Sequence, residues 1–302
     1  MNYITLTLTG LLLACGLSIT AQEKFWTSGR PDGHAPISIM GDHTHKQGEI
    51  MFSYRYMPMW MKGNLSGSDE IANDRIYEDF MIAPQNMSMD MHMLGLMYAV
   101  TDKITLMAMG NYLSNSMDLR AKNGVNFNTS SGGLGDASIS VLVQVLNVKR
   151  NAIHINAGVS LPLGDIDQRD DIPVAENAPL AYPMQLGSGT YDPMIGLTYL
   201  GQSDYFSWGI QPRYKFRLGE NEETYTLGNQ LDLSGWIAAK ISDYLSFSVS
   251  AQYMDLQSIE GADPDFNPMM MPLFNTSNSG RSQLDLGLGM NYYIPTGAFR
   301  NL

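Results

Sequence analysis

Apolar and polar side chains alternate at every second position through most of the chain after residue 48. In the stretch MSMDMHMLGLM, residues 87–97, methionine recurs at alternate positions from Met87 to Met93 and again at Met97. On a helix, alternate positions turn by about 200° and define no face, whereas on a strand they share one face. The pattern therefore predicts β-strands.

Ten such segments, each bounded by turn residues, are expected to be strands. They cover residues 49–62, 88–101, 103–115, 136–148, 151–163, 190–201, 205–218, 224–240, 243–256 and 282–294. Tight connections alternate with mostly longer ones, which we expect at 63–87, 116–135, 164–189, 219–223 and 257–281. Short periplasmic turns and long outer loops are typical of bacterial outer-membrane barrels. We predict an all-β fold, an antiparallel transmembrane β-barrel of about ten strands, or twelve if the flanking segments add strands.

The alternation also assigns the two faces of each strand. In segment 205–218, Phe206, Trp208 and Ile210 share one parity, while Gln211 and Arg213 share the other. The first set is expected to face lipid and the second the lumen. A soluble β-sandwich with one dry face would show the same alternation, but the loop asymmetry and the many aromatic residues on the apolar parity favour the barrel.

Composition narrows the partners. The 302 residues contain 29 glycines and only 16% charged residues, and the formal net charge is −12. Nucleic acid is not an expected partner, because phosphate binding needs clustered Lys and Arg. After the N-terminus no apolar run is long enough for a membrane helix, so any membrane crossing must be by strands. The expected partners are outer-membrane lipid and a small-molecule or metal-ion solute. The sequence leaves the oligomeric state open.

The first 21 residues predict a secretory signal peptide, with an apolar run from Leu11 to Leu17 and cleavage before Gln22. Cleavage would remove Cys15, the only cysteine. Alternatively, the residues around Cys15 form a loose lipoprotein box whose cysteine would carry a lipid anchor. The mature chain would divide into an N-terminal segment, 22–48, and an outer-membrane barrel, 49–302.

Methionine is concentrated on the face that the alternation assigns to the lumen. Three consecutive strands carry it, and consecutive strands of a meander barrel are neighbours. Thioethers are soft ligands that suit Cu(I) or Ag(I), and they are also adaptable filler for apolar interiors. The candidate metal-binding surface comprises Met57, Met59, Met61, Met89, Met91, Met93, Met107 and Met109, assisted by His43 and His45.

Segment 22–48 brings further candidate ligands. The stretch HAPISIMGDHTHKQGE holds His34, Met40, Asp42, His43 and His45. Imidazoles at alternate positions share a face when the chain is extended, and they suit copper or zinc. We expect this segment in the periplasm, and the sequence does not decide whether it hangs free there or folds into the lumen.

Four stretches of the sequence resemble a known protein family. HAPISIMGDHTHKQGE, FSYRYM, MSMDMHMLGLMYAVTDKITLM and NTSSGGLGD are similar to an outer-membrane family loosely called transporters and grouped with barrel proteins of meta-cleavage phenol degradation. The resemblance covers most of the chain from His34 onward. It implies an outer-membrane barrel that transports a small molecule, and it carries over no catalytic or binding residues.

Catalytic motifs are absent from the sequence. There is no H-E-x-x-H, no G-x-S-x-G and no phosphate-binding glycine loop. A lipid hydrolase with His154 as base is disfavoured because the parity of His154 directs it into the lumen, so we expect no enzyme. A polar network inside the lumen is expected from Arg55, Arg213, Lys215, Arg217, Asp232 and Asp285.

The predicted function is passage or binding of a small solute through an outer-membrane barrel. A methionine-rich lumen wall could handle soft metal ions such as Cu(I) or Ag(I). Two alternatives stay open: an uptake channel for small hydrophobic or aromatic molecules, and a sealed barrel with a mainly structural role.

Overall fold

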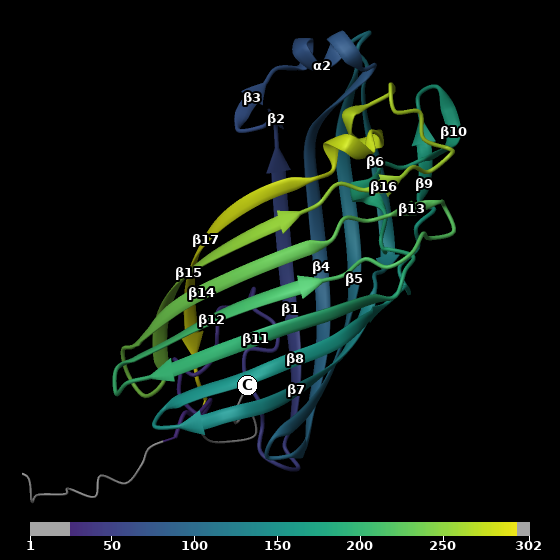
Figure 1. Cartoon of the computed structure of the whole chain (residues 1–302). Helices are drawn as coiled ribbons and strands as arrows, with labels where there is room; N and C mark the ends of the chain where they lie inside the picture. The colour runs from purple at the N-terminus through teal and green to yellow at the C-terminus, as the bar shows by residue number, and fades with distance from the viewer. Residues whose placement is uncertain (1–24, 295–302) are drawn as a thin grey trace, which may run out of the picture.

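The computed structural model describes residues 25–294 and contains one large antiparallel sheet that curls into a barrel (Figure 1). Each strand of the main path pairs with the next along the chain. The path is β1 (Ile50–Lys62), β4 (Ile82–Thr101), β5 (Ile104–Ala121), β7 (Ala137–Val148), β8 (Asn151–Leu161), β11 (Asp192–Gln202), β12 (Phe206–Lys215), β14 (Gln230–Lys240), β15 (Leu245–Leu256) and β17 (Arg281–Tyr292). This confirms the predicted ten-strand barrel.

The predicted signal peptide, 1–21, lies outside the described part of the chain. So does Cys15, for which the sequence predicts either removal with the signal peptide or a lipid anchor. Between residues 25 and 294, no helix is long and apolar enough to cross a membrane.

Exposure alternates along the strands as the sequence pattern requires. On β4, Leu94, Leu96 and Tyr98 are exposed on the outside of the sheet, while Met97 between them is buried. The same outward parity continues on the neighbouring strands. Because these outward side chains are large and apolar, the surface that they form suits contact with lipid.

The wall formed by β4 and β5 is taller than the others. Residues 116–135 were expected as a long outer loop, and this is wrong: β5 continues to Ala121 and turns into β6 (Asn126–Leu134). The first part of β5, from Ile104 to Met109, pairs with β7, and the later part, from Tyr112 to Arg120, pairs with β6. The physical reason is that alternation persists here with a polar outer face, which suits strands that rise above the lipid.

Short elements cover the end of the barrel where the long loops lie (Figure 1). They are β2 (Asn64–Ser66), β3 (Asp69–Ile71), α2 (Asn73–Asp79), β9 (Arg169–Ile172), β10 (Ala175–Pro179), η1 (Tyr182–Met184), β13 (Tyr225–Thr226), β16 (Glu260–Gly261), η2 (Pro272–Phe274) and η3 (Thr276–Asn278). β2 pairs with β3, β9 with β10, and β13 with β16.

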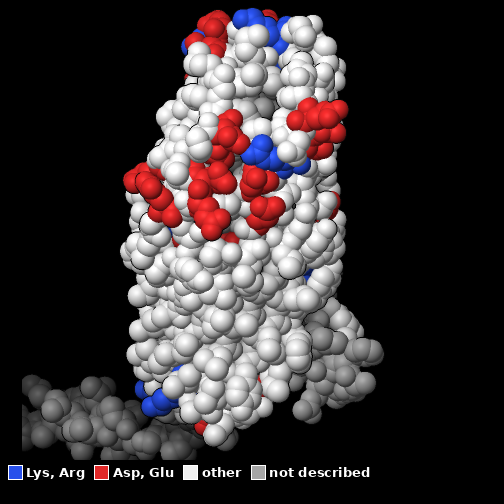
Figure 2. All heavy atoms as spheres, turned by 90° about the vertical axis from the view of Figure 1, so that its right-hand side faces the viewer, with Lys and Arg blue, Asp and Glu red and all other residues white. Residues whose placement is uncertain are grey.

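Charge separates the two ends of the outer surface. Figure 2 shows the acidic side chains gathered toward the loop end, above a broad band that carries almost no charge. On β4 the outward residues become polar toward the loop end: His92 lies 2.8 Å from the Tyr54 hydroxyl, and Tyr56 donates to Asp90 at 2.5 Å. The uncharged band is therefore the part of the barrel that lipid surrounds.

Residues 25–48 lie inside the curled sheet, at the end where the tight turns are. Both ends of the strand path contact this segment: Arg55 on β1 donates to the Met40 sulfur, and Asn291 on β17 donates to the carbonyls of Pro31 and His34. The sequence leaves open whether this segment hangs free in the periplasm or folds into the lumen. In the structure, residues 25–48 fold into the lumen. We call residues 25–48 the plug segment.

Candidate functional site

Wall side chains hold the plug segment by its backbone. His154 on β8 donates from Nε2 to the carbonyl of Gly41 at 2.9 Å. Gln211 on β12 donates to the carbonyls of Met40 and Gly41 at 3.1 and 3.3 Å. His154 thus points into the lumen, as its parity predicts. Since buried carbonyls are costly to leave unpaired, these bonds fix the course of the segment at residues 40 and 41.

The plug segment also contributes apolar side chains to the lumen. Trp26 and Ile39 pack in a buried cluster with Ala152, Leu200 and Trp236 of the wall. This cluster removes large apolar surfaces from water and fills part of the lumen near the tight turns.

Four titratable residues of the plug segment gather beside β5. The His43 ring lies between those of His34 and His45, with centroids 4.7 Å from each. Nδ1 of His43 lies 3.0 Å from Oδ1 of Asp42. The backbone N–H of His45 donates to Oγ1 of Thr105 on β5 at 3.1 Å, which ties the cluster to the wall.

Burial and mutual charge set the protonation of this cluster. Burial lowers the pKa of the His34 and His45 imidazoles to about 4. Burial would lower the pKa of His43 too, but the neighbouring Asp42 carboxylate raises it overall. Burial would raise the pKa of Asp42, and the charge of His43 lowers it. At neutral pH, the cluster thus contains at least two uncharged imidazoles beside an ionised carboxylate.

The methionines of β1, β4 and β5 form rows across the sheet. The register places Met51 opposite Met97 and Met97 opposite Met107, and a second row runs through Met61, Met87 and Met117. Between these rows, Met57 pairs with Met91, and Met59 pairs with Met89. Directly opposed residues have Cβ atoms about 4.5–5.5 Å apart, so neighbouring thioethers are within contact of one another.

Exposure differs along this methionine wall. Met97 and Met107 are buried in a cluster with Leu142, with Met51 and Met109 packed against it. Met57, Met91 and Met93 are half-buried. Met59 and Met61, near the end of β1, are 50% and 36% exposed.

The predicted polar network forms only in part. Arg213 lies 3.5 Å from Asp232, as an ion pair across β12 and β14. Arg217 pairs with Asp192, a buried residue that the sequence analysis did not single out. Asp285 on β17 is exposed and accepts from Gln283. Arg55 instead contacts the plug segment.

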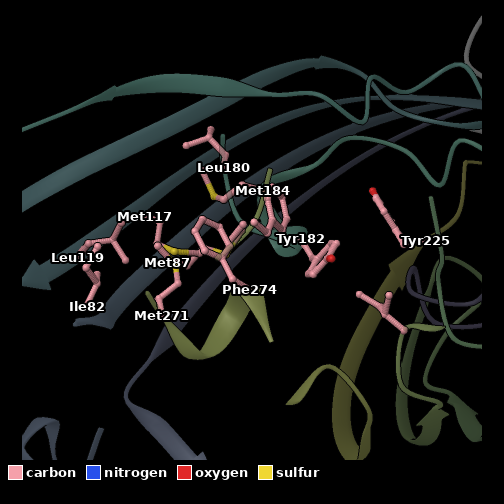
Figure 3. Close-up of a cluster of buried hydrophobic side chains, with 13 residues drawn as sticks. Ile82, Met87, Met117, Leu119, Leu180, Tyr182, Met184, Tyr225, Met271 and Phe274 are labelled. Carbon is pink, nitrogen blue, oxygen red and sulfur yellow. The ribbon is translucent and has the colours of Figure 1, made fainter. Parts of the chain in front are cut away.

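A large apolar cluster occupies the loop end of the lumen (Figure 3). Ile82, Met87, Met117 and Leu119 contribute to it from β4 and β5. The outer loops contribute the remaining buried members, which are Leu180, Ala181, Tyr182, Met184, Tyr225, Ile259, Phe266, Met271 and Phe274. Aromatic rings stack within it: the centroids of Phe266 and Phe274 are 4.5 Å apart. The loops therefore fold inward over the top of the methionine wall.

This cluster borders a cavity of about 220 Å³. Its lining is mostly apolar and includes Met117, Phe127, Ala178, Met270 and Phe274. An apolar cavity of about 150 Å³ is enough to bind benzene in a protein core. The cavity thus has the size and chemistry for a single-ring aromatic molecule.

Sequence reasoning did not find this cavity. Its loop residues show no periodicity, and the contacts that assemble the neighbouring cluster join distant parts of the chain, such as the Asp263 N–H and the Tyr182 hydroxyl. The available signal was composition: segment 266–274 holds two phenylalanines and three methionines in a region expected to be a solvated loop.

Comparisons with known proteins agree with this architecture. A family model described as "Putative MetA-pathway of phenol degradation" matches residues 88–299. Among solved structures, the chain is similar to the crystal structure of the COG4313 outer membrane channel from Pseudomonas putida F1, with a TM-score of 0.55 and 10% identity, covering 84% of this chain and 86% of that one. No curated protein matches.

The family match and the barrel with its uncharged band together locate the chain in the bacterial outer membrane. The structural likeness also agrees with the expected membrane-barrel fold.

Proposed function

The chain belongs to the family described as "Putative MetA-pathway of phenol degradation", and from this premise we propose that it takes up small hydrophobic or aromatic molecules across the outer membrane. The observation that carries the proposal is the apolar cavity of about 220 Å³ under the outer loops. A solute of this class would leave water for the cavity because its apolar surface is buried there.

The cavity borders the methionine wall. Met117 lines the cavity and is also a member of the row with Met87 and Met61. Below it, the other methionines descend toward the plug segment. Thioether side chains are flexible and make favourable contacts with aromatic rings, so they offer a succession of weak sites rather than one tight one. Release on the periplasmic side would then require the plug segment to shift.

Filling the cavity tests this proposal. Ala178 lines the cavity, and Ala178→Trp would occupy much of its volume. Ala72, exposed beside α2, provides the matched control Ala72→Trp. Both variants are compared with the parent for uptake of labelled phenol into cells with an intact lipopolysaccharide leaflet, because phospholipid alone lets small aromatics pass. We expect Ala178→Trp to lower the uptake rate at least about tenfold and the control to leave it unchanged. Equal uptake by the folded Ala178→Trp variant would refute the proposal.

A second candidate function is handling of Cu(I) or Ag(I) by the methionine wall. The observation that favours it is the row of Met51, Met97 and Met107, whose members lie directly opposite one another. This row is the one nearest the histidines: a Cβ on Gly41 would lie 3.6 Å from the Met107 sulfur. Two or three thioethers that meet at one point suit a soft monovalent ion.

A further inference from the structure

The plug segment contains a set of potential metal ligands that the proposed uptake does not use. One nitrogen of His34, one of His43 and one carboxylate oxygen of Asp42 all lie within 4.8 Å of one another. His43 is 1% exposed and Asp42 7%. A four-coordinate zinc ion with bonds of about 2.0–2.1 Å needs ligand atoms about 3.4 Å apart, so small side-chain rotations would bring these atoms into position.

Two ring nitrogens of the histidine cluster lack partners. Nε2 of His43 has no hydrogen-bond partner among the described residues, whereas Nδ1 pairs with Oδ1 of Asp42 at 3.0 Å. Nε2 of His45 is also buried without a partner. Buried polar atoms are nearly always paired, so two unpaired imidazole nitrogens at one place point to a missing ligand.

Neighbouring groups orient the ligands. The Ala35 N–H donates to Oδ2 of Asp42 at 2.9 Å, which leaves Oδ1 free to face His43. Gly41 has a φ of +62° and sits against Met107 and Asn156, so the turn that presents Asp42 and His43 fits closely to the wall. Metal sites in proteins are commonly supported by such hydrogen bonds to the ligating carboxylate.

The chemistry of the set selects the ion. Two imidazoles and one carboxylate are the donors of zinc-type sites with three protein ligands, and they do not suit calcium or magnesium, which prefer all-oxygen shells. We propose that His34, Asp42 and His43 bind one divalent transition-metal ion of the zinc class, with His45 positioned to complete the shell. All ligands belong to the plug segment, so the ion closes the loop between residues 34 and 43 and rigidifies the plug.

Metal titration tests this site independently of solute uptake. The full chain, folded in detergent without a polyhistidine tag and stripped with a chelator, is titrated with Zn²⁺ by calorimetry. Co²⁺, with its visible absorption in tetrahedral sites, serves as a second probe. We expect one ion per chain, and we expect His34→Gln and Asp42→Asn each to weaken binding at least tenfold. His92→Gln removes an exposed histidine of the outer surface and should bind like the parent.

Heat-dependent gel mobility verifies that each variant is folded. If Asp42→Asn does not fold, His34→Gln still tests the site, because it leaves the Asp42 and His43 pair intact. The absence of stoichiometric Zn²⁺ and Co²⁺ binding by the folded parent would overturn the proposal. So would unchanged affinity in a folded His34→Gln variant. Binding of Cu(I) alone, lost in a Met97→Leu and Met107→Leu variant, would also overturn it and assign the ion to the methionine row.

Discussion

Met97 on β4 lies directly opposite Met107 on β5, and both side chains are buried, 4% and 5% exposed. Lumen positions of outer-membrane barrels are usually polar, so this buried pair of thioethers is unusual. The plug segment covers it, with Gly41 close to the Met107 side chain. The lower end of the methionine wall is thus in contact with the plug, while its upper end borders the apolar cavity.

Exchanging sulfur for carbon separates the two candidate functions. Met89→Leu, Met91→Leu and Met93→Leu together conserve most of the apolar volume of the wall, at a cost of less than about 1.5 kcal/mol per site. Because the surface stays apolar, we expect phenol uptake to remain within about twofold of the parent. Retention of Ag(I), measured by competition titration, should fall if the wall handles soft ions.

The matched control for this variant is Met194→Leu, Met254→Leu and Met290→Leu, which removes three methionines from strands elsewhere in the barrel. Uptake that collapses in the first triple variant and not in the control would contradict the hydrophobic-uptake proposal. Silver retention that is equal in parent and both triples would leave Met89, Met91 and Met93 without a metal role.

The strand pattern could be predicted because a buried or lipid-covered face leaves a period of two in the sequence. The pairing of Met97 with Met107 follows from that pattern and from the tight turn at residues 101–103. The position of the plug segment does not, because its contacts join residues as far apart as Pro31 and Asn291. The aromatic cluster of the outer loops is aperiodic too, so only folding reveals that Phe266 meets Phe274.

Gly209 on β12 is required by the packing of its cross-strand partner. The Trp236 ring lies over Gly209, and a Cβ there would be 2.2 Å from Cζ2 of the ring. We expect Gly209→Ala to displace Trp236 from the cluster with the plug segment and to lower the free energy of unfolding by about 1–3 kcal/mol. Urea unfolding in micelles measures this.

Gly110→Ala is the control for that measurement. A Cβ at Gly110 has nothing within 4 Å, so this change should stay within about 0.5 kcal/mol of the parent. If Gly209→Ala and Gly110→Ala unfold at the same urea concentration, the packing of Trp236 does not require the absence of a side chain at Gly209.

Asp170 ties the hairpin of β9 and β10 to β6 in a pH-dependent way. The Ser130 N–H and hydroxyl donate to Oδ2 of Asp170 at 2.7 and 3.2 Å. The Ser130 N–H is the main cause that lowers the pKa of Asp170. The bonds favour the ionised form, so their stabilisation is present above the usual aspartate pKa of about 3.9 and is lost as the pH falls through the lower folded-state value.

We therefore expect the hairpin to separate from β6 below about pH 4. Spin labels on Val174→Cys and Val125→Cys would report the separation as a longer or broader distance distribution at low pH. Asp170→Asn should show the loosened distribution already at neutral pH. A distribution that is unchanged from pH 7 to pH 3 in the parent would contradict the prediction.

The plug segment should control conductance, because it occupies the lumen at the tight-turn end. Arg30 anchors it there by donating to the carbonyl of Ser203 at 2.7 Å and to that of Asp204 at 3.3 Å. We expect the parent to show little single-channel current, Arg30→Gln to show brief openings, and deletion of residues 27–46 to give a stable open level. A folded deletion variant with no more current than the parent would move the constriction to the apolar cluster around Phe274. In that case the outer loops, rather than the plug, would have to move for a solute to pass.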